Sequence, residues 1–431
     1  MAEQHGKALV PQIRFAGFTD PWEQRKLGEV ARRVTRKNEN RDSDLPLTIS
    51  AQYGLVDQRT FFNNQVASKD MSGYFLLRKG EFAYNKSTST DSPWGAIKRL
   101  EKYDMGCVST LYICFELLSG DPDFLVTYYE TDRWYKAVQL IAAEGARNHG
   151  LLNIAPDDFF ETQICIPKRI DEQRQIGAFF DRLDSLITLH QRKYDKLCVL
   201  KKSMLDKMFP KGGSLYPEIR FAGFTDPWEQ RRLGEVATFG GGHTPSMSDS
   251  DNYEGGNVLW VTSQDVKSHY LDGTTTQITE KGAKELTLYP AGSLVMVTRS
   301  GILRHTLPVA ELRKPSTVNQ DIRVILPQEN YYGQWLLQFF ISRNKELLLE
   351  FGKTGTTVES VDFSKMRDMV LLTPSLPEQQ QIGRYFARLD NLITLHQRKY
   401  CGVASWMLGV ALVRLGSESD GAFGEMKHVL R

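Results

Sequence analysis

Basic side chains cluster near the start of the chain, in a segment that contains a single acidic residue. The basic residues are Arg32, Arg33, Arg36, Lys37 and Arg41, and the acidic residue is Glu39. Lysine and arginine side chains at this density are suited to neutralising the phosphates of nucleic acid. A charged surface that is simply solvated explains the same run equally well. The segment therefore indicates phosphate contact as one of two open interpretations.

Polar loops in the first half of the chain combine amide, hydroxyl and basic side chains. Asparagine, lysine and arginine form bidentate contacts with purine edges, and hydroxyl groups contact bases or phosphates. The candidates for such contacts in this half are Asn85, Lys86, Ser87, Lys98, Arg99, Arg147 and Asn148. For each single residue an ordinary surface loop is the competing interpretation, so the prediction concerns the loops first and the residues second.

The second half of the chain offers a corresponding set in its own polar loops. The candidates are His243, Thr244, Thr262, Ser263, Arg299, Arg304, Asn319, Gln320, Lys353 and Thr356. Histidine, threonine, serine and asparagine are also frequent turn and capping residues, which is the competing interpretation for several of them. Both halves therefore carry candidate nucleic-acid contacts, in different loop sequences.

No catalytic or cofactor motif accompanies these loops. The segment FGKTG at 351–355 resembles a phosphate loop, but the pattern requires a glycine where Leu347 stands, and the preceding residues are helical in pattern. There is no Asn-Pro-Pro-aromatic motif, no dinucleotide fingerprint and no paired-acid and lysine nuclease centre. We therefore predict no catalytic residue, no metal ligand and no cofactor for this chain.

Length and composition indicate a folded protein of more than one domain. The chain has 431 residues, and domains hold roughly 100 to 200 residues each. Hydrophobic residues make up 41% and charged residues 25%, which suffices to bury a core. The net charge of +2 neither indicates nor excludes nucleic acid, because binding depends on where the basic residues cluster.

The cysteines and the N-terminus indicate a reducing, cytoplasmic location. The five cysteines are Cys107, Cys114, Cys165, Cys198 and Cys401. They are scattered and odd in number and form no CxxC pair, which is typical of a reducing compartment. The first residues, MAEQHGKALVPQIRF, do not have the pattern of a secretion signal, and no run of apolar residues is long enough to predict a membrane helix.

An internal repeat organises the chain. The segment at 11–30, PQIRFAGFTDPWEQRKLGEV, recurs at 217–236 with changes only at Gln12/Glu218 and Lys26/Arg232. A second pair, EQRQIGAFFDRLDSLITLHQRKY at 172–194 and EQQQIGRYFARLDNLITLHQRKY at 378–400, has the same offset of 206 residues. The sequence between the repeated blocks differs much more. We infer two copies of one unit, with constant frames that share one docking role and divergent inserts that differ in recognition.

The second repeated block predicts a long amphipathic helix. From Glu172 to Phe209 apolar residues recur every seven positions, an acidic pair lies in the first turn and Pro210 ends the helix. Such a helix spans about 55 Å and needs a partner for its apolar seam. The predicted seam residues are Ile176, Phe180, Leu183, Ile187, His190, Tyr194, Leu197 and Met204 in the first copy, and Ile382, Leu389, Ile393, His396 and Tyr400 in the second. A plain helical hairpin without any nucleic-acid role fits the same periodicity.

The divergent inserts predict mixed α/β globular domains. FLLRKGEFAYNK and LTLYPAGSLVMVTRSG each have the pattern of a strand, a turn and a strand, and NVLWVTSQDV has that of a strand entering a polar loop. The predicted domains are 1–165 and 211–373, and the predicted spacer helices are 166–210 and 374–400, followed by a tail at 401–431. If the repeat has pseudo-dyad symmetry, the two helices pair in antiparallel fashion.

With these motifs in place, the chain resembles the specificity subunit of type I restriction-modification systems. The resemblance rests on IRFAGFTDPWEQRKLGEV, on EQRQIG and EQQQIG, on ITLHQRKY in both helices and on KKSMLDKMFP at the end of the first. GEFAYNK and GARNHG in the first insert, and GGGHTP, LWVTSQDV and NQD in the second, are similar to the family's two common styles of recognition domain. The resemblance covers residues 11 to 400.

The resemblance implies two target-recognition domains related by a pseudo-dyad and joined by long antiparallel coiled-coil spacer helices. Each domain would read one half of a bipartite DNA site, while the helices set the gap and dock two modification subunits. S-adenosylmethionine would belong to those methyltransferase subunits, and ATP and Mg²⁺ to translocating restriction subunits. The chain itself would be a non-catalytic subunit that binds double-stranded DNA.

The tail departs from the family pattern. After Tyr194 the first copy continues DKLCVLKKSMLDKMFPKGG, whereas after Tyr400 the second continues CGVASWMLGVALVRLGSESDG without the same heptads. We therefore expect the second helix to be shortened near Tyr400. The alternative that this leaves open is a free-standing or decoy remnant that binds DNA or a partner without a working enzyme complex.

Overall fold

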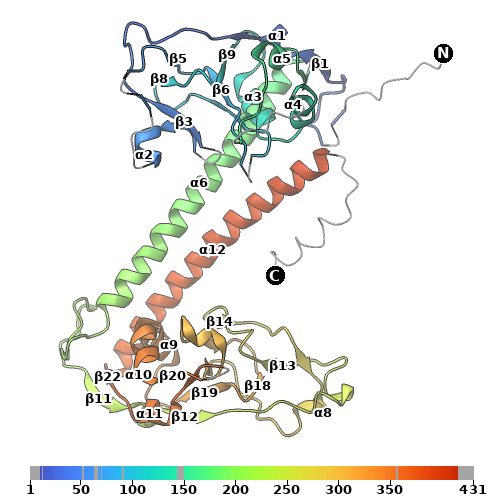
Figure 1. The fold of residues 1–431 in the computed structure, drawn as a ribbon. Helices are drawn as coiled ribbons and strands as arrows, with labels where there is room; N and C mark the ends of the chain where they lie inside the picture. Colours follow the sequence, from blue (N-terminus) through green and yellow to red (C-terminus); the bar gives the residue numbers. More distant parts are fainter. Residues whose placement is uncertain are drawn as a thin grey trace. The chain divides into compact units, whose positions relative to one another are not determined.

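The computed structural model describes residues 10–11, 13–50, 53–62, 67–68, 70–89, 92–142, 150–355 and 358–415, with only the backbone at 400, 401 and 403–415. The chain divides into two compact units, one of residues 1–189 and 399–431 and the other of residues 190–398. Figure 1 shows mixed helices and strands in both units, as the sequence predicts. Within the described residues, no helix combines the length and apolarity needed to cross a membrane.

The first unit is built on a four-stranded antiparallel sheet of order β2-β9-β6-β7. Its strands are β1 (Glu23–Lys26), β2 (Ala31–Arg33), β3 (Leu47–Ser50), β4 (Gly54–Asp57), β5 (Phe75–Arg78), β6 (Phe82–Asn85), β7 (Ala96–Arg99), β8 (Met105–Val108), β9 (Ile113–Leu117) and β10 (Gln163–Ile166). Its helices are α1 (Leu27–Val30), α2 (Gln58–Phe62), α3 (Pro122–Tyr129), α4 (Tyr135–Ile141), α5 (Pro156–Phe160) and the first half of α6 (Ile170–Lys207).

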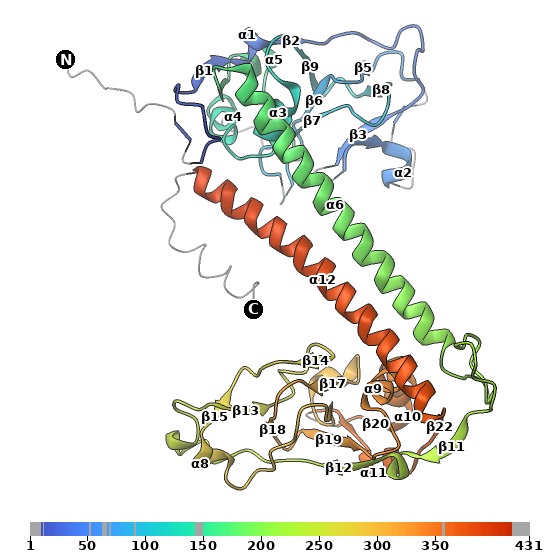
Figure 2. The same ribbon diagram turned by 180° about the vertical axis from the view of Figure 1, so that it is seen from behind.

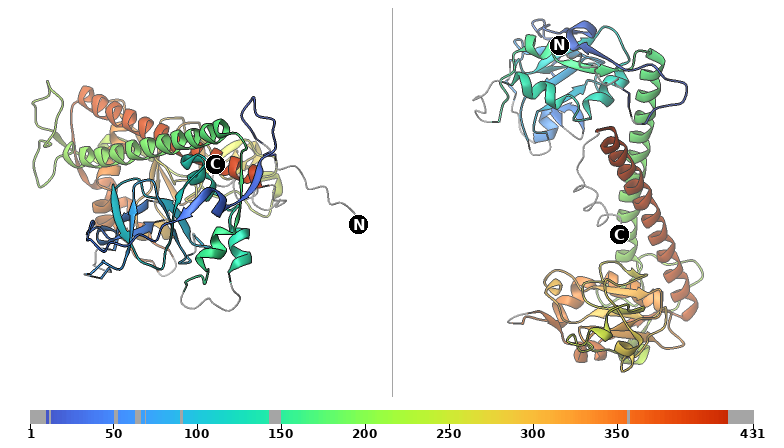
Figure 3. Two further views of the ribbon diagram at one scale, coloured as in Figure 1. Left: turned by 90° about the horizontal axis from the view of Figure 1, so that it is seen from above. Right: turned by 90° about the vertical axis from the view of Figure 1, so that its right-hand side faces the viewer.

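Alternation along β6 and β9 gives this sheet two apolar faces. Phe82, Tyr84 and Phe115 face a core that α3, α4, α5 and the start of α6 close. Ala83 and Cys114 face the opposite core, which β3, β4, β5 and β8 cover. Figure 2 shows α3 beside the start of α6, and Figure 3 gives two further views of the ribbon. The sheet therefore has no free face.

The second unit repeats this design with different strands. Its five-stranded sheet has the order β12-β19-β16-β17-β14, and a smaller sheet has the order β15-β13-β18. Its strands are β11 (Glu229–Arg232), β12 (Ala237–Gly240), β13 (Val258–Val261), β14 (Tyr270–Leu271), β15 (Gln277–Ile278), β16 (Leu294–Val297), β17 (Val309–Leu312), β18 (Thr317–Val318), β19 (Ile322–Pro327), β20 (Gly352–Lys353), β21 (Ser360–Val361) and β22 (Val370–Thr373). Its helices are α7 (Leu233–Val236), η1 (Ser250–Asn252), α8 (Glu280–Ala283), η2 (Gly301–Arg304), α9 (Gly333–Ser342), α10 (Asn344–Phe351) and α11 (Phe363–Asp368). The unit also contains the part of α6 from His190 onward and the part of α12 (Leu376–Leu415) up to Arg398.

One predicted strand is wrong. The segment before Pro290 forms only an isolated bridge between Tyr289 and Ser316, while β16 forms after it as expected. Proline lacks the N–H that a ladder requires, and the neighbouring Leu288 is 57% exposed, so the pairing does not extend beyond Tyr289. The strand–turn–strand pattern of FLLRKGEFAYNK is confirmed as β5 and β6, although the two strands pair with β8 and β9 rather than with each other.

The repeated blocks hold one another together in both units. Arg14 donates two hydrogen bonds to the Glu172 carboxylate at 2.7 and 2.8 Å, and Arg220 donates the same pair to Glu378. Each glutamate is at most 1% exposed. The first block also supplies a strand to each unit, because β1 pairs with β10 and β11 with β22. The constant frames therefore have an internal role as well as any docking role.

Removing the arginine of one such pair is expected to destabilise its unit strongly. Arg220→Met leaves the buried Glu378 carboxylate without its cation, which costs about 3 kcal/mol. For a unit of this size we expect Tm to fall by roughly 6 to 12 °C in a thermal melt. The matched control is Arg231→Met, because the Arg231–Glu229 pair is exposed and contributes little. Equal effects of the two variants would contradict this role.

The two spacer helices differ in part from the prediction. Helix α6 begins two residues before the predicted Glu172 and ends at Lys207, two residues before the predicted end at Phe209. Its residues Ile176 and Phe180 pack into the core of the first unit. Apolar periodicity indicates only that one face of a helix is buried. Near the start of α6 this face packs against the core of the first unit. Further along, in the second unit, Leu197 and Met204 pack against a core that includes Leu389.

Two further observations concern α12. The Nδ1 atoms of His190 and His396 lie 2.9 Å apart, so these equivalent positions make a direct polar contact between the helices within the second unit. The predicted shortening at Tyr400 is wrong for the backbone, since α12 continues to Leu415. The segment 401–415 contains no proline, and its two alanines and three leucines favour a helix more than Gly402 and Gly409 oppose it.

Candidate nucleic-acid interface

In the first unit, folding brings two of the predicted loops together. The amide of Thr88 donates to the carbonyl of Gly150 at 2.7 Å, and the amide of Leu152 donates to the carbonyl of Lys86 at 3.0 Å. The loop after β6 therefore runs beside the segment that ends the GARNHG stretch. Arg147 and Asn148 themselves lie outside the described residues.

Within this paired loop two candidate side chains are held by hydrogen bonds to the backbone and one is exposed. The side-chain oxygen Oδ1 of Asn85 accepts a hydrogen bond from the backbone amide of Ser87 at 3.0 Å, which shapes the turn. Lys86 donates to the carbonyl of Ile154 at 3.2 Å, and burial lowers the pKa of its ammonium group. Ser87 is exposed. The loop backbone is thus fixed, with Ser87 the candidate that faces solvent.

The strand cations of the first unit take part in ion pairs. Lys98 pairs with Glu130, and Arg99 lies 2.7 Å from both Glu101 and Asp123. Their side chains are only 13% and 17% exposed. Burial lowers the pKa of Arg99, but the hydrogen bonds and charges of Glu101 and Asp123 together outweigh it, so the pKa is raised. Sequence alone does not distinguish these stabilising cations from cations available to DNA.

The basic run at 32–41 divides in the same way. Arg36 forms a bidentate pair with the buried Glu81, whereas Arg32 pairs with Glu116 at the surface and remains 68% exposed. Arg33 lies 3.9 Å from Asp157, and Lys37 is exposed. The exposed members, Arg32, Arg33, Lys37 and Arg41, are those that remain accessible to phosphate.

In the second unit, three predicted loops converge at one edge of the small sheet. Strands β13 and β18 are parallel, with Val261 opposite Val318, so the segments that follow them leave at the same edge. The first segment begins with Thr262 and Ser263, and the second with Asn319 and Gln320. Residues far apart in sequence are thereby placed side by side.

The glycine-rich loop completes this edge. Thr244 donates to the side-chain oxygen of Gln320 at 2.7 Å, so the GGGHTP segment reaches the loop after β18. A side chain at Gly242 would lie 1.8 Å from the Val318 carbonyl oxygen, which explains why only glycine fits there. His243 and Gln320 are exposed. We name the segments 242–245, 262–265 and 319–321 the loop edge.

Hydrogen bonds fix the loop edge internally. The hydroxyl and amide of Thr262 both donate to Asp265 at 2.8 Å. Asn319 is 6% exposed and accepts from the amide of Asp321, so it holds the turn. Thr298, at the end of β16, donates twice to the carbonyl of Asp321, which brings the exposed Arg299 next to the same loop. The exposed donors are therefore presented on a rigid support.

The second unit also contains a basic hollow, whose lining residue Ser360 forms a bridge with Arg299. It has a volume of about 580 Å³, and its lining includes Arg304, His305, Lys345 and Lys353 together with Glu359. Arg304 pairs with Glu359 and lowers its pKa, and a hydrogen bond from Lys353 lowers that of Asp362. Thr356 lies outside the described residues. Arg304 and Lys353 remain about 60% exposed, so they are available to a phosphate.

Lys345 is the residue of this hollow that sequence reasoning missed. It lies on α10, well away in the chain from Arg304, and only the fold brings the two together. A lysine on an amphipathic helix carries no local signal that separates it from any solvated lysine. Among the residues that the structure describes, no group of three or more potential metal ligands occurs.

Comparisons with known proteins give one family and a consistent set of relatives. Residues 225–403 match a family model described as type I restriction modification DNA specificity domain. The specificity subunit of the type I restriction enzyme EcoR124I/EcoR124II from Escherichia coli is 32% identical over 166 residues, 38% of this chain and 41% of that subunit. The MjaIX specificity subunit from Methanocaldococcus jannaschii is 28% identical over 171 residues, 38% of each chain.

The matched segments therefore span about two fifths of the length of these relatives. A solved structure extends the likeness at the level of the fold. The S subunit of a type I restriction-modification system from M. genitalium aligns with a TM-score of 0.56 at 13% identity, over 95% of this chain and all of that one. The loop edge and the basic hollow both lie inside the segment 225–403 that the family model matches.

Proposed function

We propose that this chain is the DNA specificity subunit of a type I restriction-modification system, on the premise that residues 225–403 belong to the type I restriction modification DNA specificity domain family. The observation that carries the proposal is the loop edge. Three loops from distant parts of the sequence present amide, hydroxyl and imidazole groups at one rigid edge inside that family domain. Such groups are suited to reading base edges in the major groove.

In this proposal each unit reads one half of a bipartite site. The first unit uses the paired loop after β6 and its exposed cations, and the second uses the loop edge for bases and the basic hollow for phosphates. The helices α6 and α12 set the gap between the half-sites and dock two modification subunits. Those partners bring S-adenosylmethionine, and restriction subunits bring ATP and Mg²⁺. The chain supplies specificity and no catalytic step, in the cytoplasm where its DNA lies.

The direct test is to co-express the chain with its modification subunits and map methyladenine across the host DNA. The expected result is a single bipartite motif with a fixed gap. Methylation without a shared motif, or no methylation although the chain is soluble and assembled with its partners, would overturn the proposal. A chain that reads DNA without assembling would instead bind one sequence in a pull-down of genomic fragments while leaving it unmethylated.

The basic hollow is expected to contribute phosphate contacts rather than sequence discrimination. A plot of log affinity against log salt concentration has a negative slope, and each lost phosphate contact reduces the magnitude of that slope by about 0.9. The double variant Lys345→Ala and Lys353→Ala should therefore weaken all duplexes alike and reduce the slope by about 1.8. Fluorescence anisotropy with cognate and scrambled duplexes at several salt concentrations measures both quantities.

Two variants serve as controls for the hollow. Arg231→Ala removes an exposed cation of β11 and should leave the slope unchanged. Gln320→Ala, on the loop edge, should leave the slope nearly unchanged but relax discrimination at one base pair by about 1 to 3 kcal/mol. A hollow variant that altered base preference while keeping its slope would contradict the assignment.

A further inference from the structure

An arginine on the five-stranded sheet of the second unit has no carboxylate partner. Arg323 lies on β19, which is hydrogen-bonded to β12 on one side and to β16 on the other. Its side chain is exposed, and the ion pairs found among the described residues do not include it. The backbone of Arg323 is therefore fixed by the sheet, whereas its guanidinium group is available to a ligand.

A comparison with Arg313 shows what distinguishes this residue. Arg313 directly follows β17, lies with its guanidinium carbon 4.3 Å from the ring centroid of Tyr270, and pairs with the 5% exposed Glu311 at 3.0 Å. The guanidinium carbon of Arg323 lies 5.9 Å from the ring centroid of Phe363. No carboxylate of the described residues accompanies this second contact within ion-pair distance. The charge of Arg323 is therefore not neutralised within the unit.

The glycine-rich segment leaves room for the guanidinium of Arg323. A side-chain carbon at Gly241 would lie 3.0 Å from Nη1 of Arg323, closer than side chains normally approach. The amide of Gly241 donates to the hydroxyl of Tyr289 at 2.9 Å, and that hydroxyl donates to the carbonyl of Gly241 at 2.8 Å. The backbone at Gly241 is thus fixed, and together with the ring of Phe363 it limits where the guanidinium can lie.

Arg323 lies beside the loop edge. The segment 319–321 leads directly into β19, and Gly242, the first residue of the segment 242–245, follows Gly241. The exposed His243 and Gln320 belong to these same two segments. The guanidinium therefore adjoins the groups that are proposed to read bases, although Arg323 itself belongs to a regular strand.

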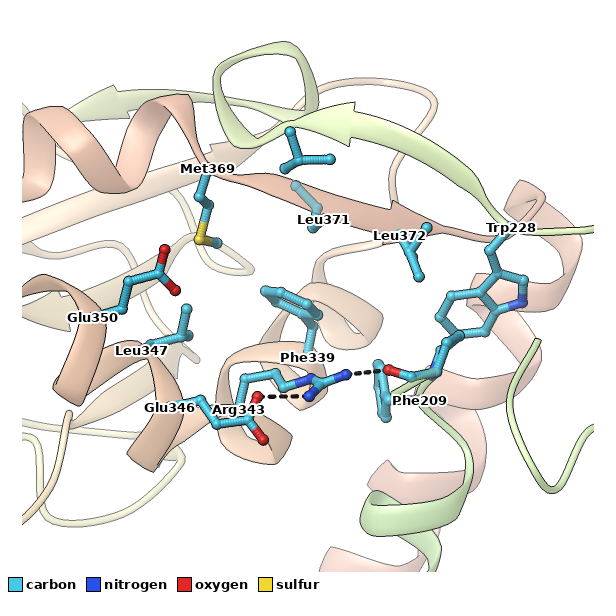
Figure 4. A pocket seen from close by; sticks show the side chains of 12 residues that line it. Phe209, Trp228, Phe339, Arg343, Glu346, Leu347, Glu350, Met369, Leu371 and Leu372 are labelled. Atoms are coloured by element: carbon cyan, nitrogen blue, oxygen red, sulfur yellow. Dashed lines mark hydrogen bonds and ion pairs between the residues drawn. The ribbon is translucent and has the colours of Figure 1, made fainter. Parts of the chain in front are cut away.

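The distribution of charge on the second unit indicates which surface suits DNA. A pocket of about 260 Å³ between α10, β22 and the segment after α6 is lined by Glu346 and Glu350, and Figure 4 shows both carboxylates beside apolar side chains. Arg343 is its one basic lining residue and already pairs with Glu346. The basic hollow, in contrast, reaches the loop edge through the bridge between Ser360 and Arg299. Phosphates therefore favour the side of the loop edge and the hollow.

We propose that Arg323 is a specificity-determining residue of the second unit and that it recognises a guanine in the half-site read by this unit. This inference rests on the proposed function, because it assigns one base contact within that role. A guanidinium presents parallel N–H donors that match O6 and N7 of guanine in the major groove. Because Phe363 and Gly241 restrict the group before DNA binds, less conformational entropy is lost in the contact.

The test compares the wild-type chain with Arg323→Gln, each co-expressed with the modification subunits, by mapping methyladenine across the host DNA. The half-site of the second unit is the one that changes when residues 237–369 are exchanged. We expect a G·C pair in that half-site of the wild type, and a preference for A·T at the same position in the variant, because glutamine pairs with N6 and N7 of adenine. Anisotropy with duplexes that differ at this pair should show discrimination changed by roughly 5- to 150-fold. Arg231→Gln, which changes an exposed arginine of β11, should leave the motif unchanged.

A second set of variants changes the position or the shape of the cation without removing its charge. Gly241→Ala places a methyl group against Nη1 of Arg323 and should weaken discrimination at the same base pair. Gly273→Ala is the matched control, because a side chain there meets no atom within 4 Å. Arg323→Lys keeps the charge but not the planar fork, so it should preserve the salt dependence of binding and lose the discrimination.

The outcomes separate this inference from the proposed function. A wild-type bipartite motif that persists unchanged in Arg323→Gln would refute the role of Arg323 and leave the proposed function intact. Equal weakening of all duplexes, with the magnitude of the salt slope reduced by about 0.9, would identify a phosphate contact and refute the role as well. A change in the other half-site would contradict the assignment to the second unit. If the wild-type chain produced no motif, the proposed function would fail and this inference with it.

Discussion

Replacement of residues 31–162 by the corresponding segment of another specificity subunit is expected to change one half of the recognised DNA site and leave the other half intact. These boundaries keep the β1–β10 pair and the buried Arg14–Glu172 ion pair, so the constant frame remains assembled around the new insert. The second unit has its own sheet and its own cores, and therefore no residue of the loop edge depends on the exchanged segment.

Methyladenine mapping of the chimera measures this exchange directly. The reciprocal exchange of residues 237–369, which leaves the β11–β22 pair in place, should change the opposite half-site. A chimera with both exchanges should recognise a site in which both halves are new. If either single exchange alters both half-sites, or alters neither, the proposal that each unit reads one half-site is wrong.

Lengthening both spacer helices is expected to widen the gap between the half-sites without changing their bases. The boundary between the two units falls within α6, between Leu189 and His190, and within α12, between Arg398 and Lys399. We would place the insertions at these two positions. Seven residues add about 10.5 Å and return the helix to within about 20° of its original face, which preserves the packing on either side. At 3.4 Å per base pair, the gap should grow by about three base pairs.

The placement of the insertion matters. An insertion after Leu197 would separate Lys201 and Met204 from His190, which contacts His396, and would disrupt the second unit itself. The control replaces the seven residues before each junction without adding any. An unchanged gap with the lengthened chain, or altered half-site bases, would show that the helices do not set the spacing.

The sequence by itself determined the plan of the chain. The repeat at an offset of 206 residues, the heptad pattern that ends at Pro210 and the alternation in β5, β6 and β13 are local properties, and local hydrophobic periodicity follows directly from which face is buried. The mixed α/β class and the long helix α6 follow from these patterns. Periodicity does not identify the partner of a buried face, however. The heptad pattern predicts that Ile176 lies in a helix seam, whereas it packs into the core of the first unit.

Only the tertiary structure decided which polar residues are available for recognition. Lys98 and Arg99 look like DNA contacts in the sequence, yet their carboxylate partners come from other elements and hold them in ion pairs. Lys345 has no local signal, yet the fold places it in the basic hollow. The loop edge exists because β13 and β18 are parallel neighbours although 57 residues separate paired positions such as Trp260 and Thr317. Long-range pairing of this kind depends on the packing of the whole unit, and no window of sequence contains it.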